Sequence, residues 1–362
     1  RDCVGAVQLL PPDLVPDGFD SLQYEPLTPD QVESHVQNTG AQTGLGLQEE
    51  WHDFRLSIAG AQEKTALLRV GHAWCRPLGA TPTTHILKPQ IGITQGRQFD
   101  LSQSVENEWL CLQLLKALGL PAANAAMAKF GDQRVLVVER FDRNWQGVEP
   151  GQARKKGFMP APGTWIARLP QEDLCQALGV PPHLKYEAEG GPSMRQCLDV
   201  LASSKQAETD RACFVKAQLA FWVLAATDGH AKNFSIAHGR GAVYALTPLY
   251  DVLSAWPVIG KGARQIPEQQ AKLAMAMRSK NAHYRLHDIH AWHWRAIADG
   301  TGVPGLWDQL LNLIAAIEAA FNTVEGLLPN DFPSPVWESI RHGARSQAER
   351  FVREVNAASK DE

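Results

Sequence analysis

The sequence predicts an α+β fold in two lobes: a mixed lobe with an antiparallel sheet, then a larger lobe that is mostly helical. The chain has 362 residues, more than the roughly 250–300 that one hydrophobic core usually serves. Short β-prone runs are frequent in the first part of the chain, and long apolar runs with helical spacing dominate the last part. We therefore expect a first lobe at residues 1–140, a connection at 141–165 and a helical lobe at 166–362.

The first lobe contains a loop of small residues at 57–65, between β-prone runs at 54–56 and 66–68. Small side chains let backbone N–H groups approach a phosphate closely. The loop satisfies neither G-x-G-x-x-G nor the Walker pattern, so alone it is a weak signal. Its candidate nucleotide-binding residues are Ser57, Ala59, Gly60, Ala61, Gln62 and Lys64.

A lysine and a glutamate further along are candidates for a functional ion pair. Lys88 ends a short apolar run, as expected for a strand lysine that pairs with nucleotide phosphates, although an isolated strand lysine is usually an exposed edge residue. A helix follows, with Ser104 as its expected N-cap and a stop at Gly119. Glu108 near its start is the candidate partner of Lys88, and the alternative is a solvated carboxylate favoured by the helix dipole.

A strand at 134–138 leads into a segment, 139–142, where we place the hinge between the lobes. The backbone of such a hinge is suited to hydrogen bonding with adenine. The following segment, 144–165, is rich in glycine and proline and contains three neighbouring cations, so we expect a mobile basic loop. Such cations are more often only solvated than bound to nucleic acid or to an acidic surface.

The most informative residues lie at the end of an apolar run, 217–226, that predicts a buried helix. Asp228 follows this helix, and Asn233 comes five positions later. With Asp251 beyond, this is the spacing by which kinase catalytic loops hold the attacking hydroxyl and Mg²⁺.

Two β-prone runs at 234–237 and 243–246, with a glycine turn between them, predict a hairpin that brings Asp251 back toward Asn233. Each of the three polar residues alone is better explained as a cap or a turn. Their combination favours a two-lobed protein-kinase-like fold that holds ATP between its lobes.

The C-terminal part is expected to be architectural, with helices at 306–328 and 336–355. His287, His290 and His293 recur every third residue and invite a metal interpretation. No cysteine or paired carboxylate lies nearby in the sequence, so we prefer an amphipathic helix.

Composition excludes several classes of protein. A net charge of −4 argues against general affinity for nucleic acid, so any DNA contact needs a local patch or a basic partner. No apolar run approaches the roughly 20 residues that span a bilayer, and we expect no membrane contact. The six cysteines lie far apart, as expected for reduced thiols of a cytoplasmic protein.

Seven ordered segments together resemble the HipA family of bacterial serine/threonine kinase toxins, which are paired with a small DNA-binding antitoxin, HipB. The segments are 57–68, 83–88, 101–108, 138–143, 168–176, 185–192 and 227–235. The resemblance implies that Asp228 is the catalytic base and that Lys88 pairs with the phosphates of ATP. It also implies that Asn233 and Asp251 are the Mg²⁺ ligands.

The resemblance implies further roles for five residues. Ser57 is expected to be an autophosphorylation site, where an added charge of about −1.5 to −2 repels ATP and inactivates the enzyme. Glu139 and Phe141 are expected to meet adenine through their backbones. His230 and Lys232 are expected near the substrate or the γ-phosphate.

The resemblance also implies partners: a HipB-like helix-turn-helix antitoxin, DNA mainly through that antitoxin, and an aminoacyl-tRNA synthetase as substrate. Two departures weaken the partner assignments. Family members have an N-terminal subdomain ahead of the point where this chain begins, and the 144–165 segment is longer than the usual connection. A small-molecule kinase and a non-catalytic co-repressor remain as alternatives.

Overall fold

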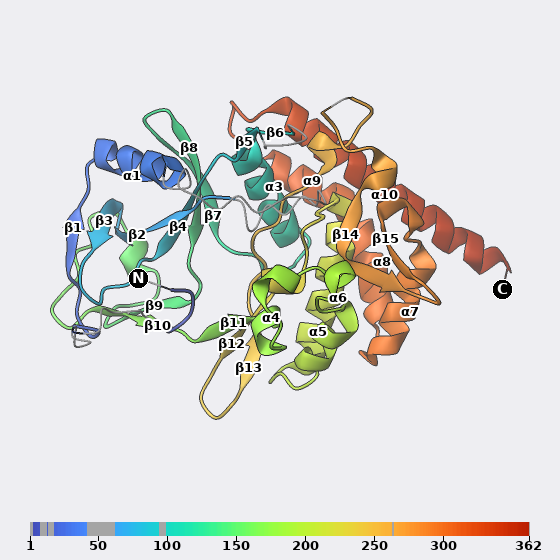
Figure 1. Ribbon diagram of the computed structural model, residues 1–362, viewed down its shortest axis with the longest axis horizontal. Coiled ribbons are helices and arrows are strands. Elements are labelled where there is room, and N and C mark those ends of the chain that lie inside the picture. The colour runs from blue at the N-terminus through green and yellow to red at the C-terminus, as the bar shows by residue number, and fades with distance from the viewer. Residues whose placement is uncertain are drawn as a thin grey trace.

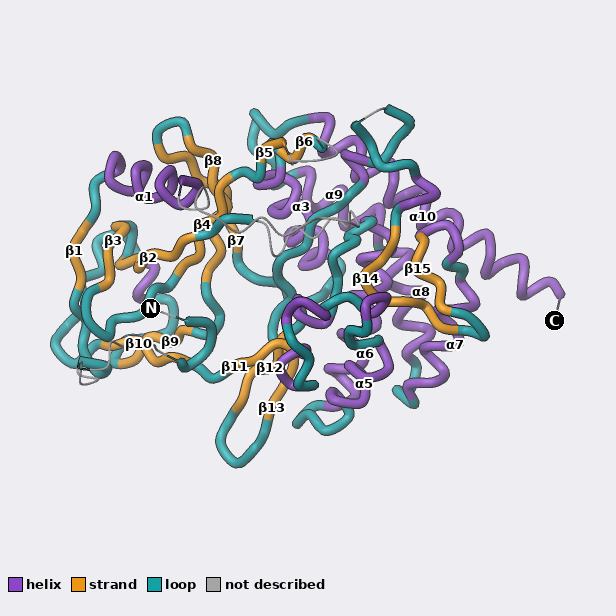
Figure 2. The backbone as a smooth tube through the Cα atoms, in the orientation of Figure 1, coloured by secondary structure: helices purple, strands orange, loops and turns teal. Residues whose placement is uncertain are grey.

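The computed structural model describes residues 3–7, 13, 18–41, 62–93, 99–262 and 264–361. These residues form two lobes, a sheet lobe at the left of Figure 1 and a helical lobe at the right. Figure 2 shows the same division, with most strands in one lobe and most helices in the other. The α+β, two-lobed, protein-kinase-like architecture expected from the sequence is confirmed.

The sheet lobe is built on one six-stranded antiparallel sheet. In spatial order its strands are β1 (Tyr24–Pro26), β3 (Ala73–Pro77), β2 (Thr65–Val70), β4 (His85–Pro89), β8 (Gln133–Glu139) and β7 (Ala125–Phe130). Helix α1 (Pro29–Ala41) lies over one face, where Val32 and Val36 pack against Leu67 and Leu87. Side chains alternate between the two faces of a strand, so the neighbours of Leu87 in β4 point to the opposite face.

The opposite face of the sheet packs on α3 (Ser104–Ala117), which joins the two lobes. Leu136 and Val138 of β8 belong to the same hydrophobic core as α3 and the helical lobe. A short strand pair, β5 (Gly92–Ile93) with β6 (Asp100–Leu101), precedes the helix. The N-cap expectation is wrong: Gln103 holds that position, and the Ser104 hydroxyl accepts a hydrogen bond from the Ile91 N–H at 3.0 Å.

The segment expected to be a loop, 144–165, contains regular structure. Strands β9 (Arg143–Gln146) and β10 (Trp165–Arg168) pair in antiparallel register, and the short 3₁₀ helix η2 (Gln152–Arg154) lies between them. Ala153 and Phe158 from this hairpin share a buried cluster with Leu68 of the sheet. Apolar residues among the glycines and prolines therefore dock the hairpin on the first lobe.

The helical lobe is arranged around α6 (Ala207–Leu224), which packs against several other helices. The helix begins ten residues before the apolar run expected from the sequence, because its first turns are polar. Its other helices are α4 (Leu174–Ala177), α5 (Met194–Leu201), α7 (Ala291–Thr301), α8 (Leu306–Ala315), α9 (Ile317–Glu325) and α10 (Ser334–Asp361). The short 3₁₀ helices are η3 (Pro182–Leu184), η4 (Glu187–Glu189), η5 (Ala231–Asn233), η6 (Trp256–Val258), η7 (Glu268–Gln270) and η8 (Leu286–Asp288).

The single helix expected at 306–328 is two helices, and this expectation is wrong. The chain turns at Ala316, between α8 and α9. The two halves have partly different neighbours: both contact α10, but α8 also packs on α6 and α7, whereas α9 packs on α3. The turn thus lets one apolar stretch serve two parts of the core.

The predicted hairpin is present. Strands β12 (Ser235–His238) and β13 (Tyr244–Leu246) pair in antiparallel register, and β11 (Gln171–Asp173) adds a third strand. A second hairpin, β14 (Lys272–Arg278) with β15 (Ala282–Arg285), lies against η4 and α7.

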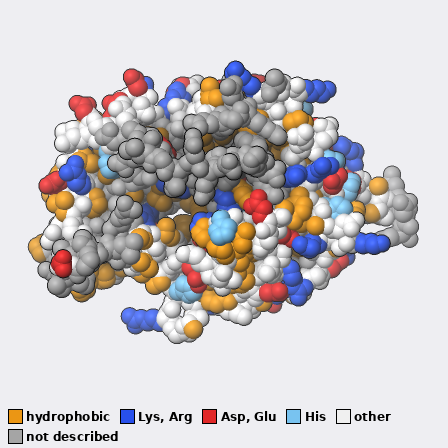
Figure 3. All heavy atoms as spheres, in the orientation of Figure 1, with side chains coloured by type: hydrophobic (Ala, Val, Ile, Leu, Met, Phe, Trp, Pro, Cys, Tyr) orange, Lys and Arg blue, Asp and Glu red, His pale blue; other side chains and the backbone are white. Residues whose placement is uncertain are grey.

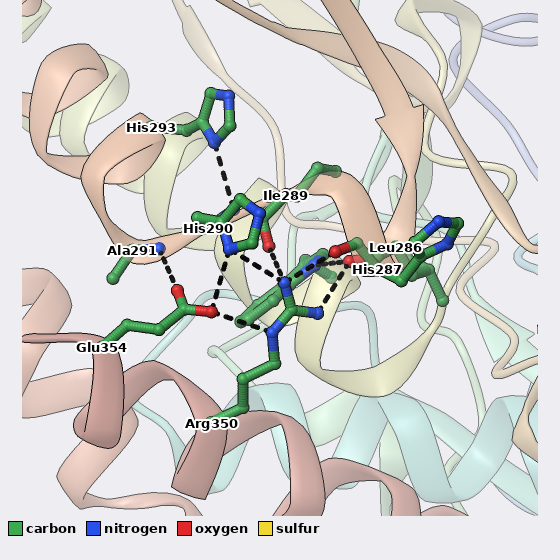
Figure 4. A network of polar contacts seen from close by, with 9 residues as sticks. Leu286, His287, Ile289, His290, Ala291, His293, Arg350 and Glu354 are labelled. Carbon is green, nitrogen blue, oxygen red and sulfur yellow. Dashed lines mark hydrogen bonds and ion pairs between the residues drawn. The ribbon is translucent and has the colours of Figure 1, made fainter. Parts of the chain in front are cut away.

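The three histidines considered for a metal site have structural roles. His287 is in η8, His290 is the N-cap of α7, and the Nδ1 atom of His293 accepts a hydrogen bond from the His290 N–H at 3.0 Å. Glu354 of α10 accepts the Ala291 N–H at 2.7 Å beside them (Figure 4). Within the described ranges, no group of three or more His, Cys, Asp or Glu side chains is placed to hold a metal ion.

Basic and acidic side chains of the described residues are interspersed over the face shown in Figure 3. Among those same residues, no helix has both the length and the apolar character that a bilayer-spanning segment requires.

The buried imidazole of His293 should make stability depend on pH. Burial lowers the pKa of His293 from 6.5 to about 4, so its stabilising contribution is complete above pH 6.5 and declines as pH falls toward 4. His293→Gln keeps an acceptor for the cap and removes the titration. From pH 7 to pH 5, the wild type should lose about 1–2 kcal/mol more of its free energy of unfolding than this variant does. Urea unfolding at the two pH values measures this difference.

The exposed His342 offers a matched control, and His342→Gln should follow the wild type at both pH values. An identical pH dependence in His293→Gln and the wild type would contradict the prediction.

Candidate active site

The centre of the site is a buried lysine held between two carboxylates from different elements. The Lys88 ammonium of β4 lies 2.7 Å from Glu108 Oε1 of α3 and 2.7 Å from Asp251 Oδ1, beyond β13. The three side chains are only 7%, 2% and 8% exposed, respectively. The Lys88–Glu108 pair expected from the sequence is therefore present, and the solvated-carboxylate alternative is wrong.

Burial alone would lower the pKa of Lys88, but the charges of Asp251 and Glu108 outweigh it and raise that pKa above its ordinary value. Burial likewise acts to raise the pKa of Asp251. The neighbouring charge of Lys88 outweighs burial and lowers the pKa of Asp251 from 3.8 to about 2. The lysine is thus held charged at neutral pH, and Asp251 is held as a carboxylate.

Asp251 is positioned by the β12–β13 hairpin and by a constrained backbone. Its φ is +60°, in the left-handed region that non-glycine residues rarely adopt. The preceding residue, Tyr250, has its hydroxyl 2.5 Å from the Ser235 hydroxyl and 3.3 Å from the Lys232 carbonyl. These contacts tie the segment that carries Asp251 to the end of the catalytic loop.

The loop from Asp228 to Asn233 is closed by hydrogen bonds onto one carbonyl. The Asp228 carbonyl accepts the Asn233 side-chain N–H at 2.9 Å and the His230 backbone N–H at 2.8 Å. The Asn233 amide nitrogen makes this bond, so the amide oxygen points away from the Asp228 carbonyl. The five-residue spacing predicted from the sequence therefore closes a compact loop around η5.

The two loop residues expected near the substrate or the γ-phosphate, His230 and Lys232, each contact a carboxylate of the protein. His230 is 0% exposed, and its Nε2 is 3.5 Å from Asp228 Oδ1. Burial lowers the pKa of His230 to about 3, so the imidazole is neutral. Lys232 forms an ion pair at 2.8 Å with Asp173, at the start of α4. The His230 side chain thus forms part of the wall around Asp228, and Lys232 links the loop to α4.

The sequence reasoning missed one side chain that contacts the catalytic loop. The Tyr186 hydroxyl donates a hydrogen bond to Asp228 Oδ1 at 2.6 Å, and its ring packs edge-on against His230 at 5.2 Å between centroids. Tyr186 lies in the segment 185–192, which was singled out only for its family resemblance. A tyrosine 42 positions before Asp228 gives no local signal of this contact.

The hinge residues lie between the two lobes. The Glu139 carboxylate is bound by Arg154 of the β9–β10 hairpin at 2.6 Å, and the Phe141 ring lies 5.8 Å from the ring of Tyr250. A cavity of about 230 Å³ lies beside Glu139, lined by His85 and other residues.

Four of the candidate nucleotide-loop residues, Ser57, Ala59, Gly60 and Ala61, lie outside the described residues. Gln62 is buried and donates a hydrogen bond to the Pro89 carbonyl at 3.0 Å, next to Lys88. The positive charge of Lys64 is close enough to help lower the pKa of Asp251, after the larger effect of Lys88. The end of this loop therefore lies beside the lysine.

The residues present fit a magnesium ion. The Asn233 amide oxygen and the Asp251 carboxylate are the hard oxygen ligands that Mg²⁺ prefers, and Mg²⁺ commonly takes only one or two protein ligands. When bound, the ion would neutralise charge on phosphate oxygens.

The fold and the site define the class: a protein with a protein-kinase-like fold and a buried lysine–carboxylate centre between its lobes. The family profile described as the HipA-like C-terminal domain matches residues 56–324. A putative kinase, Y4mE of Sinorhizobium fredii, is 32% identical over 326 residues, which cover 90% of this chain and 70% of that protein. The chain belongs to the HipA family.

Two further comparisons concern Shewanella oneidensis. Its serine/threonine-protein kinase toxin HipA is 28% identical over 289 residues, which cover 76% of this chain and 58% of that protein. The solved structure of the HipA, HipB and operator DNA complex superposes with a TM-score of 0.75 at 24% identity, covering 98% of this chain and 77% of that chain. This likeness shows the shared fold.

Removing a charge from the buried Lys88 centre should destabilise the protein more than removing a charge from an exposed ion pair. Glu108→Gln keeps the shape of the side chain but removes one of the two buried charges facing Lys88, so it should lower the free energy of unfolding by about 1.5–3 kcal/mol. Glu25→Gln removes one charge of an exposed pair with Arg76 in the same lobe and should cost less than about 1 kcal/mol. Urea unfolding at pH 7 measures both, and equal losses would argue against a buried charge centre.

Proposed function

We propose that this protein is an ATP-dependent serine/threonine protein kinase that acts as a HipA-type toxin. The observation that carries the proposal is the Lys88 ammonium held between Glu108 and Asp251, close to the loop that bears Asp228 and Asn233. A lysine–glutamate pair, a metal-binding aspartate and a loop with a base and an asparagine are the parts that kinases use for phosphoryl transfer. Relatives named as kinases support the same activity.

In this proposal Lys88 pairs with the α- and β-phosphates of ATP, while Asn233 and Asp251 hold Mg²⁺. Asp228 orients the serine hydroxyl of a protein substrate and accepts its proton. The serine oxygen forms a bond to the γ-phosphorus as the bond from that phosphorus to the β-phosphate oxygen breaks, and ADP leaves. Positioning and charge neutralisation supply most of the rate enhancement.

Nucleotide binding is proposed to use both sides of the cleft. Adenine would meet the backbones of Glu139 and Phe141 at the hinge. The phosphates would meet the loop that includes Ser57, Ala59, Gly60, Ala61, Gln62 and Lys64. Gln62 and Lys64 lie beside the Lys88 centre, which supports this placement. His230 and Lys232 would support the loop around the γ-phosphate.

The proposed biological role is inhibition of translation, leading to dormancy, through phosphorylation of an aminoacyl-tRNA synthetase in the cytoplasm. The proposed regulator is a HipB-like helix-turn-helix antitoxin, through which DNA would be contacted. Support comes from the similar HipA of S. oneidensis, whose solved complex contains HipB and operator DNA. This chain spans 58% of the length of that curated HipA, so the whole protein's partners and substrate remain proposals.

Removal of the proposed base gives the first test of activity. Asp228→Ala should lower phosphoryl transfer by at least about 100-fold, because base catalysis contributes roughly 10²–10⁴. ATP binding should persist, since Lys88, Asn233 and Asp251 are unchanged. The measurement is label transfer from ATP with Mg²⁺ in a cell extract, followed by mass spectrometry of the phosphorylated sites.

Asp199→Ala, at an exposed carboxylate paired with Arg195, is the control and should transfer label like the wild type. Phosphate on a serine of an aminoacyl-tRNA synthetase is the expected result. Label found only in metabolites would indicate a small-molecule kinase, and no transfer above the Asp228→Ala background would indicate a co-repressor.

Self-inactivation gives a separate test. Ser57→Ala should keep its initial rate of transfer but lose the decline in activity that follows preincubation with ATP, because no phosphate can then repel the nucleotide. Rates before and after preincubation, with mass spectrometry of the 57–65 peptide, measure this. A Ser57→Ala variant that declines like the wild type would place the self-inactivating site elsewhere.

A further inference from the structure

The Tyr186 side chain is bonded directly to the carboxylate proposed as the base. Its hydroxyl donates to Asp228 Oδ1 at 2.6 Å, within the range of short hydrogen bonds to charged acceptors. Tyr186 is 7% exposed and Asp228 is 9% exposed, so water competes little for this contact. One of the two carboxylate oxygens of Asp228 is therefore occupied from within the protein.

The backbone around Tyr186 is held in one conformation. Its carbonyl accepts the Gly191 N–H at 2.8 Å, and a Cβ atom added to Gly191 would lie 2.7 Å from that carbonyl oxygen and 2.3 Å from the Leu184 carbonyl oxygen. Only glycine allows so tight a return of the chain. The glycine in the 185–192 segment thus has a steric function, which is to close the turn that presents Tyr186.

A second anchor joins this turn to a distant strand. The side chain of Glu187 is 2% exposed and accepts the Ala276 N–H at 2.6 Å and the Arg278 guanidinium at 2.6 Å, both from β14. The Glu187 contacts lie at the start of η4, and the Gly191 contact lies just after its end. Together they fix the backbone that presents the Tyr186 ring. These contacts restrict the movement of Tyr186, so its hydroxyl stays bonded to Asp228.

The tyrosine ring is also held from the side of the catalytic loop. Its edge-on contact with the His230 ring, with centroids 5.2 Å apart, fills the space between the turn and the loop. His230 is fully buried, so this contact has no alternative in solvent. The hydroxyl and the ring thus have separable functions: the ring packs, and the hydroxyl bonds to Asp228.

We propose that Tyr186 is a positioning residue for phosphoryl transfer, which fixes Asp228 Oδ1 and thereby directs Oδ2 toward the acceptor hydroxyl. The inference rests on the proposed kinase function and deepens it. Tyr186 exchanges no proton in the step: the serine proton passes to Asp228 Oδ2 as the oxygen–phosphorus bond forms, and the Tyr186 O–H bond stays intact.

Tyr186→Phe tests the inference because it removes the hydroxyl and keeps the ring on His230. We expect kcat for label transfer at saturating ATP to fall about tenfold, with KM for ATP unchanged, because a misdirected base retains only part of the contribution of base catalysis.

Tyr244→Phe is the matched control in the same lobe. The Tyr244 hydroxyl donates to a backbone carbonyl, that of Val200, at 2.6 Å, away from the catalytic loop. This variant should keep the wild-type kcat, and both variants should keep the wild-type Tm within a few degrees.

The outcomes separate this inference from the proposed function. Transfer that persists in Asp228→Ala would overturn the kinase mechanism itself. Transfer that needs Asp228 but is unchanged in rate in Tyr186→Phe would overturn the positioning role alone. Equal losses in Tyr186→Phe and Tyr244→Phe, or a loss that comes with a raised KM for ATP, would also overturn it.

Discussion

The buried ammonium of Lys88 is the interaction on which the site depends. It joins a strand of the first lobe, the helix between the lobes and the segment beyond β13, through two contacts of 2.7 Å. A buried charge is costly unless it is paired, and removing one partner of a buried pair usually destabilises more than the pair itself contributed. The arrangement of the two lobes is therefore coupled to Lys88 and Asp251, the side chains proposed to bind the phosphates and Mg²⁺, and to Glu108, which pairs with Lys88.

Asp228 and Asn233 are held by a different kind of constraint. Hydrogen bonds from the Asn233 side chain and the His230 backbone close the loop around the Asp228 carbonyl, and Tyr186 contacts Asp228 and His230 from outside the loop. Asp251 adds a strained backbone with φ of +60°. Strained positions of this kind persist where the surrounding structure overdetermines them, and they cluster at functional sites. A preorganised group needs little reorganisation during the reaction, which is what electrostatic catalysis requires.

Much of the candidate site could be predicted from sequence because its spacing is local. Asp228 and Asn233 are five positions apart. The glycine turn between two β-prone runs predicts the short hairpin that leads to Asp251. The pairing of Lys88 with Glu108 was also predicted, since a strand lysine followed by a glutamate near a helix start is an arrangement that kinases use. The expectations that proved wrong, such as the N-cap at Ser104 and the single helix at 306–328, concern details that packing decides.

The sequence by itself determined the α+β class, the order of the candidate site segments and the polar residues of the 228–233 loop, because these follow from local periodicity and spacing. Only the tertiary structure decided that the 144–165 segment forms a docked hairpin, that Lys232 pairs with Asp173, and that Tyr186 bonds to Asp228. Each of these is a contact between segments far apart in the chain. Such contacts depend on the shape and polarity of the whole core, which no window of neighbouring residues contains.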